Sequence, residues 1–168
     1  MKYARFEELP VWRDAIEIAV KTYALTAHAQ FKGQYSLRDQ IERAAVSISN
    51  NIAEGFERGT TQELLTFLYI ARGSAGEVRS MLCLFERLPL LVDLKSEISN
   101  LKSRAENVSR QLRGWADSLQ NSDIRGQRYL NNNTRRSAKK SKEQEEFMEE
   151  FRSAQAINIS NSRNRDAG

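Results

Sequence analysis

Apolar residues recur at three- and four-residue steps in four long stretches of the chain, and this periodicity limits the fold more than any other feature. Such steps place side chains on one face of an α-helix, and no stretch alternates with the period of two that marks a half-buried strand. The four expected apolar faces are Trp12, Ala15, Ile16, Ala19, Tyr23 and Thr26; Leu37, Ile41, Ala44, Ile48 and Ile52; Leu64, Leu68, Ala71, Ala75, Val78, Leu82 and Phe85; and Leu94, Ile98, Leu101, Ala105, Val108, Leu112, Trp115 and Leu119. Because short links join the stretches, the pattern predicts an all-α protein, an antiparallel up-down-up-down four-helix bundle.

The ends of the expected helices carry residues that start or stop helices. Pro10 fits the first turn of the first helix, which we expect to run to about Ala29. Side chains that can accept a hydrogen bond from the first turn precede the other three helices, and the expected caps are Ser36 with Asp39, Thr60 with Glu63, and Asp93. Gly55 and Gly59 flank the end of the second helix, where glycine readily adopts a left-handed cap. Pro89 ends the third helix.

Charge and composition divide the chain into two parts. Residues 1–120 carry a net charge of +1, whereas residues 121–168 carry +3 and lose the apolar periodicity. We therefore expect a bundle over residues 1–120 and a basic, polar, mostly disordered C-terminal tail over residues 121–168, in which residues 143–156 have the pattern of a short acidic amphipathic helix. The run RRSAKKSK (135–142) holds five cations and no acid. Contact with nucleic acid, a solvated linker and docking on another partner are all open interpretations of this run.

The counts of reactive residues argue against an enzyme. The chain has one cysteine, Cys83, which excludes an internal disulfide, and one histidine, His28, which leaves neither a metal-ligating cluster nor a Ser-His-Asp arrangement. We expect no catalytic activity, no cofactor and no metal. No apolar run reaches the roughly 18 residues of a membrane span, and the first ten residues lack the apolar core of a signal peptide. We therefore expect a cytoplasmic protein without a membrane partner.

Polar residues accompany the apolar faces of the second and third helices. In SISNNIAEG, Ser47, Asn51 and Glu54 lie beside the expected core positions, and Ser74 and Glu77 lie in the same way on the third helix. Three interpretations are open, namely an interhelical hydrogen-bond network, a binding site within or between bundles, and a catalytic site. Two glycines of the third helix are expected points of close approach, Gly73 and Gly76.

Three ordered blocks resemble the signature of a bacterial family of four-helix bundle proteins: FEELPVW (6–12), RAAVSISNNIAEGFER (43–58) and FLYIARGSAGE (67–77). That family includes proteins encoded by intervening sequences of 23S ribosomal RNA genes, and it resembles the accessory variability proteins of diversity-generating retroelements. The resemblance covers about residues 5–118. The chain departs from the family in the loop AHAQFKGQY, which lacks the usual proline-containing turn, and in its longer C-terminal tail.

The resemblance implies an antiparallel four-helix bundle that assembles into a ring-like homopentamer. It also implies a nucleic-acid role and, as in the retroelement relatives, contact with a partner reverse transcriptase. Seven polar residues of the second and third helices belong to the family pattern: Arg43, Ser47, Asn51, Glu54, Arg58, Ser74 and Glu77. We interpret them as a network that orders the bundle and its subunit interface, a hypothesis that alanine substitutions of Asn51 and Glu54 test.

Positive charge in the bundle concentrates on the fourth helix. Residues 7–21 of the first helix carry a net charge of −2, whereas the fourth helix carries +2. Repeated around a ring, such a face would attract phosphates, and a merely solvated helix face is the alternative. The candidate nucleic-acid-binding residues are Lys95, Lys102, Arg104, Arg110, Arg113, Arg135, Arg136, Lys139, Lys140 and Lys142. The expected function is a non-enzymatic, oligomeric bundle that binds RNA or DNA as an accessory protein and assists a reverse transcriptase, and the alternative is a protein-interaction scaffold that binds no nucleic acid.

Overall fold

Four long helices and three short 3-10 helices make up the described part of the chain. The computed structural model describes residues 3–121, and these contain no strand. The elements are η1 (Phe6–Glu8), α1 (Pro10–Thr26), η2 (Ala29–Phe31), α2 (Tyr35–Glu57), α3 (Thr61–Phe85), η3 (Pro89–Leu94) and α4 (Lys95–Gln120). The prediction of an all-α fold is confirmed. The expected tail and its short helix lie outside the described residues.

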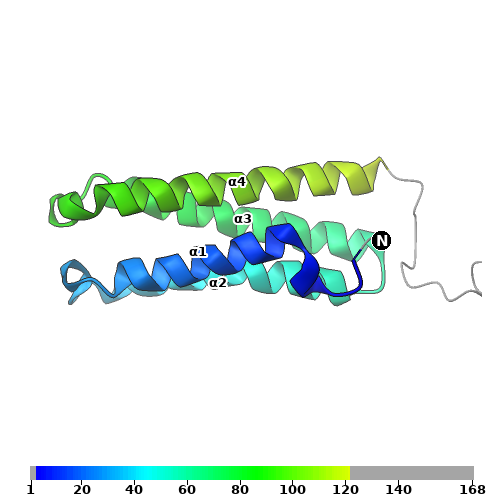
Figure 1. Ribbon diagram of the computed structural model, residues 1–168, viewed down its shortest axis with the longest axis horizontal. Helices are drawn as coiled ribbons and strands as arrows, with labels where there is room; N and C mark the ends of the chain where they lie inside the picture. The colour runs from blue at the N-terminus through cyan, green and yellow to red at the C-terminus, as the bar shows by residue number, and fades with distance from the viewer. Residues whose placement is uncertain (1–2, 122–168) are drawn as a thin grey trace, which may run out of the picture. The chain divides into compact units, whose positions relative to one another are not determined.

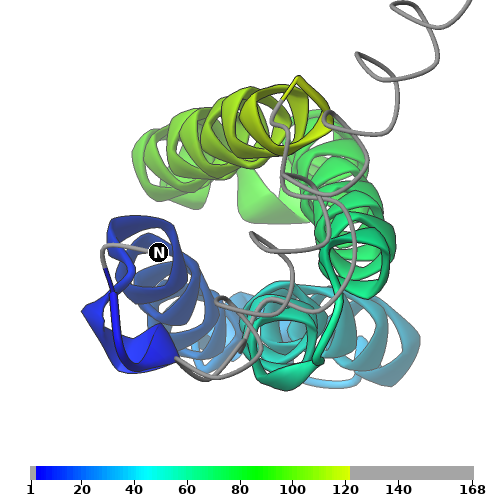
Figure 2. The same cartoon turned by 90° about the vertical axis from the view of Figure 1, so that its right-hand side faces the viewer.

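The four helices lie side by side along one long axis. In Figure 1 the links between successive helices lie at alternating ends, so that each helix runs back along the one before it. Seen along that axis in Figure 2, the helices surround a common centre. Each helix packs against the next in the chain, and α1 also packs against α4, which closes the circle. Short links join antiparallel neighbours in such bundles.

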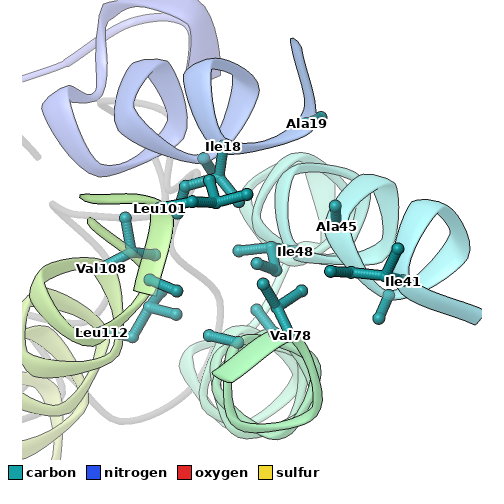
Figure 3. Close-up of a cluster of buried hydrophobic side chains, with 14 of the residues drawn as sticks. Ile18, Ala19, Ile41, Ala45, Ile48, Val78, Leu101, Val108 and Leu112 are labelled. Atoms are coloured by element: carbon teal, nitrogen blue, oxygen red, sulfur yellow. The ribbon is translucent and has the colours of Figure 1, made fainter. Parts of the chain in front are cut away.

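The core lies on the inward faces of all four helices. Figure 3 shows Ile18 of α1, Ile48 of α2, Val78 of α3 and Leu112 of α4 gathered in one cluster. All four of these side chains are fully buried. The expected apolar faces of α2, α3 and α4 are the observed ones, although the first expected residue of α2 and the last two of α4 are only half-buried. Because apolar burial is the main favourable term in folding, this continuous core holds the four helices together.

The buried face of α1 differs from the expected one. Ile18, Thr22 and Leu25 lie in the core, whereas Tyr23 is 51% exposed. The expectation was ambiguous because apolar residues occur almost all round this helix, including Val20, which is 58% exposed. Thr22 tolerates burial because its hydroxyl donates a hydrogen bond of 2.8 Å to the Ile18 carbonyl of its own helix.

The helix ends agree with the sequence at some positions and not at others. Pro10 stands in the first turn of α1, and Thr60 caps α3 by accepting a hydrogen bond from the Glu63 backbone N–H at 3.2 Å. Ser36 does not cap α2, because the helix begins one residue earlier, at Tyr35. Two more expected helix ends differ from the structure. α1 ends at Thr26, before the expected Ala29, and Asp93 belongs to η3 and does not cap α4.

The glycines of α2 and α3 have different roles from those expected. Gly55 lies within α2 and has no left-handed conformation, because Gly33 is the one described glycine with a positive φ. A Cβ atom at Gly55 would lie 2.7 Å from the Cβ of Phe67, so glycine is required there by the close approach of α3. Gly73 and Gly76, which were expected at points of close approach, do not lie at one. They are exposed, and added Cβ atoms would meet nothing within 4 Å.

Candidate functional site

A chain of hydrogen bonds joins α2 to α3 at the middle of their seam. The hydroxyls of Ser47 and Ser74 lie 2.9 Å apart, and Ser74 also donates to the carbonyl of Ile70 at 3.2 Å. The side-chain amide of Asn51 donates to the carbonyl oxygen of Ser47 at 2.7 Å and to its hydroxyl at 2.9 Å. Ser47 and Asn51 are half-buried and Ser74 is buried. Three of the seven residues of the expected polar network therefore meet in one place.

Two further members of the expected network lie at the exposed edge of the same seam. The Gln40 side-chain amide of α2 donates a hydrogen bond to the Glu77 carboxylate of α3. Arg43 donates to the Gln40 carbonyl oxygen at 3.1 Å and lies 3.1 Å from the Asp39 carboxylate. Arg43 and Glu77 are thus connected through Gln40, a residue that sequence reasoning did not select because it lies outside the small-residue pattern.

The last two members, Glu54 and Arg58, pair with each other near the C-terminal end of α2. The Arg58 guanidinium donates to the Glu54 carboxylate at 2.5 Å and lies over the Phe67 ring of α3, 5.2 Å from its centroid. The hydrogen bond from Arg58 to Glu54 raises the pKa of the guanidinium. About half of each side chain is exposed, so this pair presents a charged surface where α2 ends.

The five expected cations of α4 do not share one face. Lys102 points toward α3, where its ammonium donates two hydrogen bonds of 2.6 Å to Glu86 just after the end of that helix. Arg104 points to the other side, toward α1, and its Nε donates to Asn100 at 3.0 Å. The other three are Lys95, Arg110 and Arg113, all exposed. The positive charge of α4 is therefore distributed around its solvent-facing side.

A groove runs between α1 and α4. Two adjoining hollows of about 280 Å³ and 330 Å³ lie along it, and Arg104 lines both. Gln111 of α4 spans the groove by donating to the Asp14 carboxylate of α1 at 2.7 Å. Lys21 of α1 lines the larger hollow. The groove holds charges of both signs, so its lining offers no strong preference for an anion.

Two arginines of α3 were not among the candidate binding residues predicted from the sequence. Arg72 and Arg79 are half-buried, and the Nε of Arg79 is buried without a hydrogen-bond partner. Their spacing of seven residues, continued to Glu86, was the available signal, because that spacing keeps side chains on one side of a helix. The cations of the tail, Arg135, Arg136, Lys139, Lys140 and Lys142, lie outside the described residues.

The one histidine of the chain, His28, lies near an acidic side chain of α4. His28 lies 3.3 Å from the Glu97 carboxylate at the end of α1, and both side chains are exposed. Among residues 3–121, no group of three or more histidine, cysteine, aspartate or glutamate side chains is placed to hold a metal ion. No helix within the same range is long and apolar enough to cross a membrane.

Most of the sequence matches a protein-family model. The model of the 23S rRNA-intervening sequence protein family matches residues 7–114. This range contains the blocks at 43–58 and 67–77 and most of the block at 6–12, so the resemblance drawn from those blocks is confirmed. No curated protein matches the chain.

Proposed function

The chain belongs to the 23S rRNA-intervening sequence protein family, and from this membership and its charge distribution we propose that it is a non-enzymatic accessory protein that binds RNA or DNA. In this proposal the binding is electrostatic and directed at phosphates, and such contacts of lysine and arginine with the nucleic-acid backbone carry no sequence information. In this proposal the bundle supplies the rigid surface and the basic run 135–142 adds further contacts.

The charge of α4 is the observation that carries the proposal. The helix holds five cations against three acids, and each of the five cations is at least partly exposed. Two of these acids are close to cations of the same helix, Glu106 to Arg110 at 3.9 Å and Asp117 to Arg113 at 3.7 Å. Exposed pairs of this kind are weak, so phosphates can compete for the cations.

Self-association is part of the proposal. The resemblance implies a homopentameric ring, which would repeat the α4 charge around an axis. Three apolar side chains on α1 and at the start of α2 are exposed, and contact with a second subunit would bury them: Val20 is 58% exposed, Tyr23 51% and Tyr35 75%. Assistance to a reverse transcriptase is the finer part of the proposal and rests on the resemblance alone.

A protein-interaction scaffold is the second candidate function. Three apolar side chains near the link between α3 and α4 favour it, because Leu84 is 42% exposed, Leu90 40% and Val92 51%. Apolar surface of this kind marks docking sites for proteins when it is contiguous. The two candidates differ in their salt dependence, since phosphate binding weakens steeply with salt and apolar docking does not.

Fluorescence anisotropy with labelled single-stranded RNA and with DNA of the same sequence tests the proposal. The full chain is titrated at about 50, 100 and 200 mM salt, beside a variant with Arg135, Arg136, Lys139, Lys140 and Lys142 replaced by glutamine. We expect both proteins to bind and both affinities to fall as salt rises, with the native chain showing the steeper slope. Binding by the native chain alone would move the function to the tail. No binding by the native chain at the lowest salt would leave the scaffold.

A further inference from the structure

Arg72 and Arg79 lie on the side of α3 that faces α4. Arg79 and Glu86 follow Arg72 at seven-residue steps, and seven residues make nearly two full turns of helix, so the three side chains form a line. Residues near both ends of this line reach α4. The Tyr69 hydroxyl accepts a hydrogen bond of 2.6 Å from Gln120, and the Glu86 carboxylate accepts two from Lys102. The two arginines between them therefore border the α3–α4 seam.

The guanidinium groups of Arg72 and Arg79 are not used by the fold. Within residues 3–121 neither forms a hydrogen bond or an ion pair with another side chain or carbonyl. Of the Arg79 nitrogens, Nε alone is buried without a partner, which leaves the terminal nitrogens open to solvent. The terminal N–H groups of Arg79 are therefore the donors that this side chain can offer to an anion from solvent.

Cations of α4 continue the positive charge across the seam. Lys95 and Lys102 are seven residues apart, so Lys95 lies one repeat before the residue that contacts Glu86. Arg113 lies seven residues before Gln120, which contacts Tyr69. We name the set Arg72, Arg79, Lys95, Lys102 and Arg113 the α3–α4 strip. Its five cations lie beside three acids, Glu86, Asp117 and Glu106, the last of which stands seven residues before Arg113, and this leaves a net charge of +2.

Small residues line the outer surface of α3 beside the α3–α4 strip. Gly73, Gly76 and Ser80 are exposed there, and open space lies above the two glycines. The acid nearest to them on this helix, Glu77, is turned toward α2, where Gln40 donates to it. Glycine in a helix interior costs roughly 1 kcal/mol relative to alanine, and nothing within the described bundle requires it at these two positions. An approaching strand could come close to this part of the helix.

We propose that the α3–α4 strip binds the sugar-phosphate backbone of a single-stranded nucleic acid. The proposal rests on the proposed function and deepens it, because it adds Arg72 and Arg79 and sets aside Arg104 and Arg110, which line the groove between α1 and α4. Arginine donates paired hydrogen bonds to phosphate oxygens, so the two free guanidiniums are the strongest anchors of the strip. From Tyr69 to Glu86 the line is about 25 Å long, room for several nucleotides. Base identity is not read.

A matched pair of full-chain variants tests this surface. Arg72→Gln/Arg79→Gln removes two charges from the α3–α4 strip, and Lys21→Gln/Lys32→Gln removes two exposed charges from α1 and the link after it. Anisotropy is measured with the same labelled RNA and DNA strands over the same salt series. We expect the arginine variant to lose about tenfold in affinity at about 50 mM salt and to lower the salt slope by about 1.4, the value for two phosphates on a single strand. We expect the lysine variant to lose less than about threefold, as a change of net charge alone.

The outcomes separate this inference from the proposed function. If both variants lose affinity equally, binding follows net charge and the assignment of binding to the α3–α4 strip is wrong. If the arginine variant binds like the native chain, the assignment of binding to the strip is wrong, while the proposed function stands. If the native chain itself does not bind, the proposed function fails first. A change of oligomer mass with unchanged RNA binding in the arginine variant would assign the surface to a second copy of the chain. Because Arg79 is half-buried, Arg72→Gln alone and Arg79→Lys serve as second variants, and circular dichroism melts confirm folding.

Discussion

The hydroxyl of Ser47 on α2 lies 2.9 Å from the hydroxyl of Ser74 on α3, beside the apolar core of the bundle. Both hydroxyls are also bonded along their own helices, Ser74 to the Ile70 carbonyl and Ser47 to the amide of Asn51. Each hydroxyl of this small network therefore has a partner, which is the condition under which a buried hydroxyl does not destabilise a fold. A sliding of α3 along α2 would break the contact, so the network favours one register of the two helices.

Asn51→Ala removes the donor that holds Ser47. We expect the free energy of unfolding to fall by about 1 kcal/mol, because two hydrogen bonds in a half-buried position are lost. Urea denaturation followed by circular dichroism measures it. Glu54→Ala is the matched control on the same flank, and its exposed pair with Arg58 predicts little change in stability. An altered oligomer mass for Glu54→Ala in light scattering would instead place the pair in a subunit interface.

Gly55→Ala tests the closest approach of α2 and α3. The new Cβ would lie 2.7 Å from the Cβ of Phe67, so the helices must separate, and we expect a loss of about 1–3 kcal/mol. Gly76→Ala is the control, because its Cβ would meet open space and alanine is the better helix former, for a gain of up to about 1 kcal/mol. Opposite shifts of the two thermal midpoints are expected. Equal shifts would show that helix propensity alone governs both positions.

Most of the fold was predictable because the periodicity of three helices leaves one choice of face. On α2, α3 and α4 the apolar positions form one stripe at three- and four-residue steps, so the core followed directly. On α1 apolar residues occur almost all round the helix, so the neighbouring helices decide whether Ile18 or Ile16 is buried in the core. Gly55 was assigned to a cap for a similar reason, since local sequence cannot reveal the approach of Phe67 from another helix.

The candidate site was predictable one helix at a time. The flank holding Ser47 and Asn51 follows from helical geometry, as does the flank holding Ser74. The contact between them needs the register of α2 against α3, which no repeat in the sequence specifies. Likewise, Arg72 and Arg79 look like ordinary solvated arginines until α4 is known to lie beside them. The sequence also grouped the cations of α4 together, although Lys102 and Arg104 lie on opposite sides of that helix.

Thr60→Ala removes the N-terminal cap of α3. The Thr60 hydroxyl accepts from the Glu63 backbone and donates to its carboxylate at 2.7 Å, so we expect a loss of about 1 kcal/mol in urea denaturation. Thr66→Ala is the control within the same helix, where the hydroxyl bonds only to the Gln62 carbonyl one turn back. That variant should unfold at the same or a slightly higher urea concentration. A smaller loss for Thr60→Ala than for Thr66→Ala would contradict the role of the cap.

Glu86→Gln separates stability from binding within the α3–α4 strip. The substitution weakens the link to Lys102, so we expect a loss of up to about 1 kcal/mol in the free energy of unfolding. It also frees one cation of the strip, so RNA affinity at about 50 mM salt should rise by about threefold while stability falls. Glu57→Gln makes the same change of charge at an exposed position at the end of α2. Equal gains in RNA affinity for both variants would assign the effect to net charge.

Tyr69→Leu tests whether the α3–α4 strip also contacts bases. The Tyr69 ring is 43% exposed beside Arg72, and its hydroxyl is fixed by Gln120 at 2.6 Å, so its aromatic face is available to a base of a bound strand. Stacking of one base on an aromatic side chain is worth about 1–3 kcal/mol, so affinity should fall at least about fivefold. The salt slope should not change, because no phosphate contact is removed. Tyr69→Phe keeps the ring and loses only the hydrogen bond to Gln120, so it should bind nearly as the native chain does. A lower salt slope for Tyr69→Leu, or an equal loss of affinity for both variants, would mean that the tyrosine positions the strip through Gln120 and does not stack on a base.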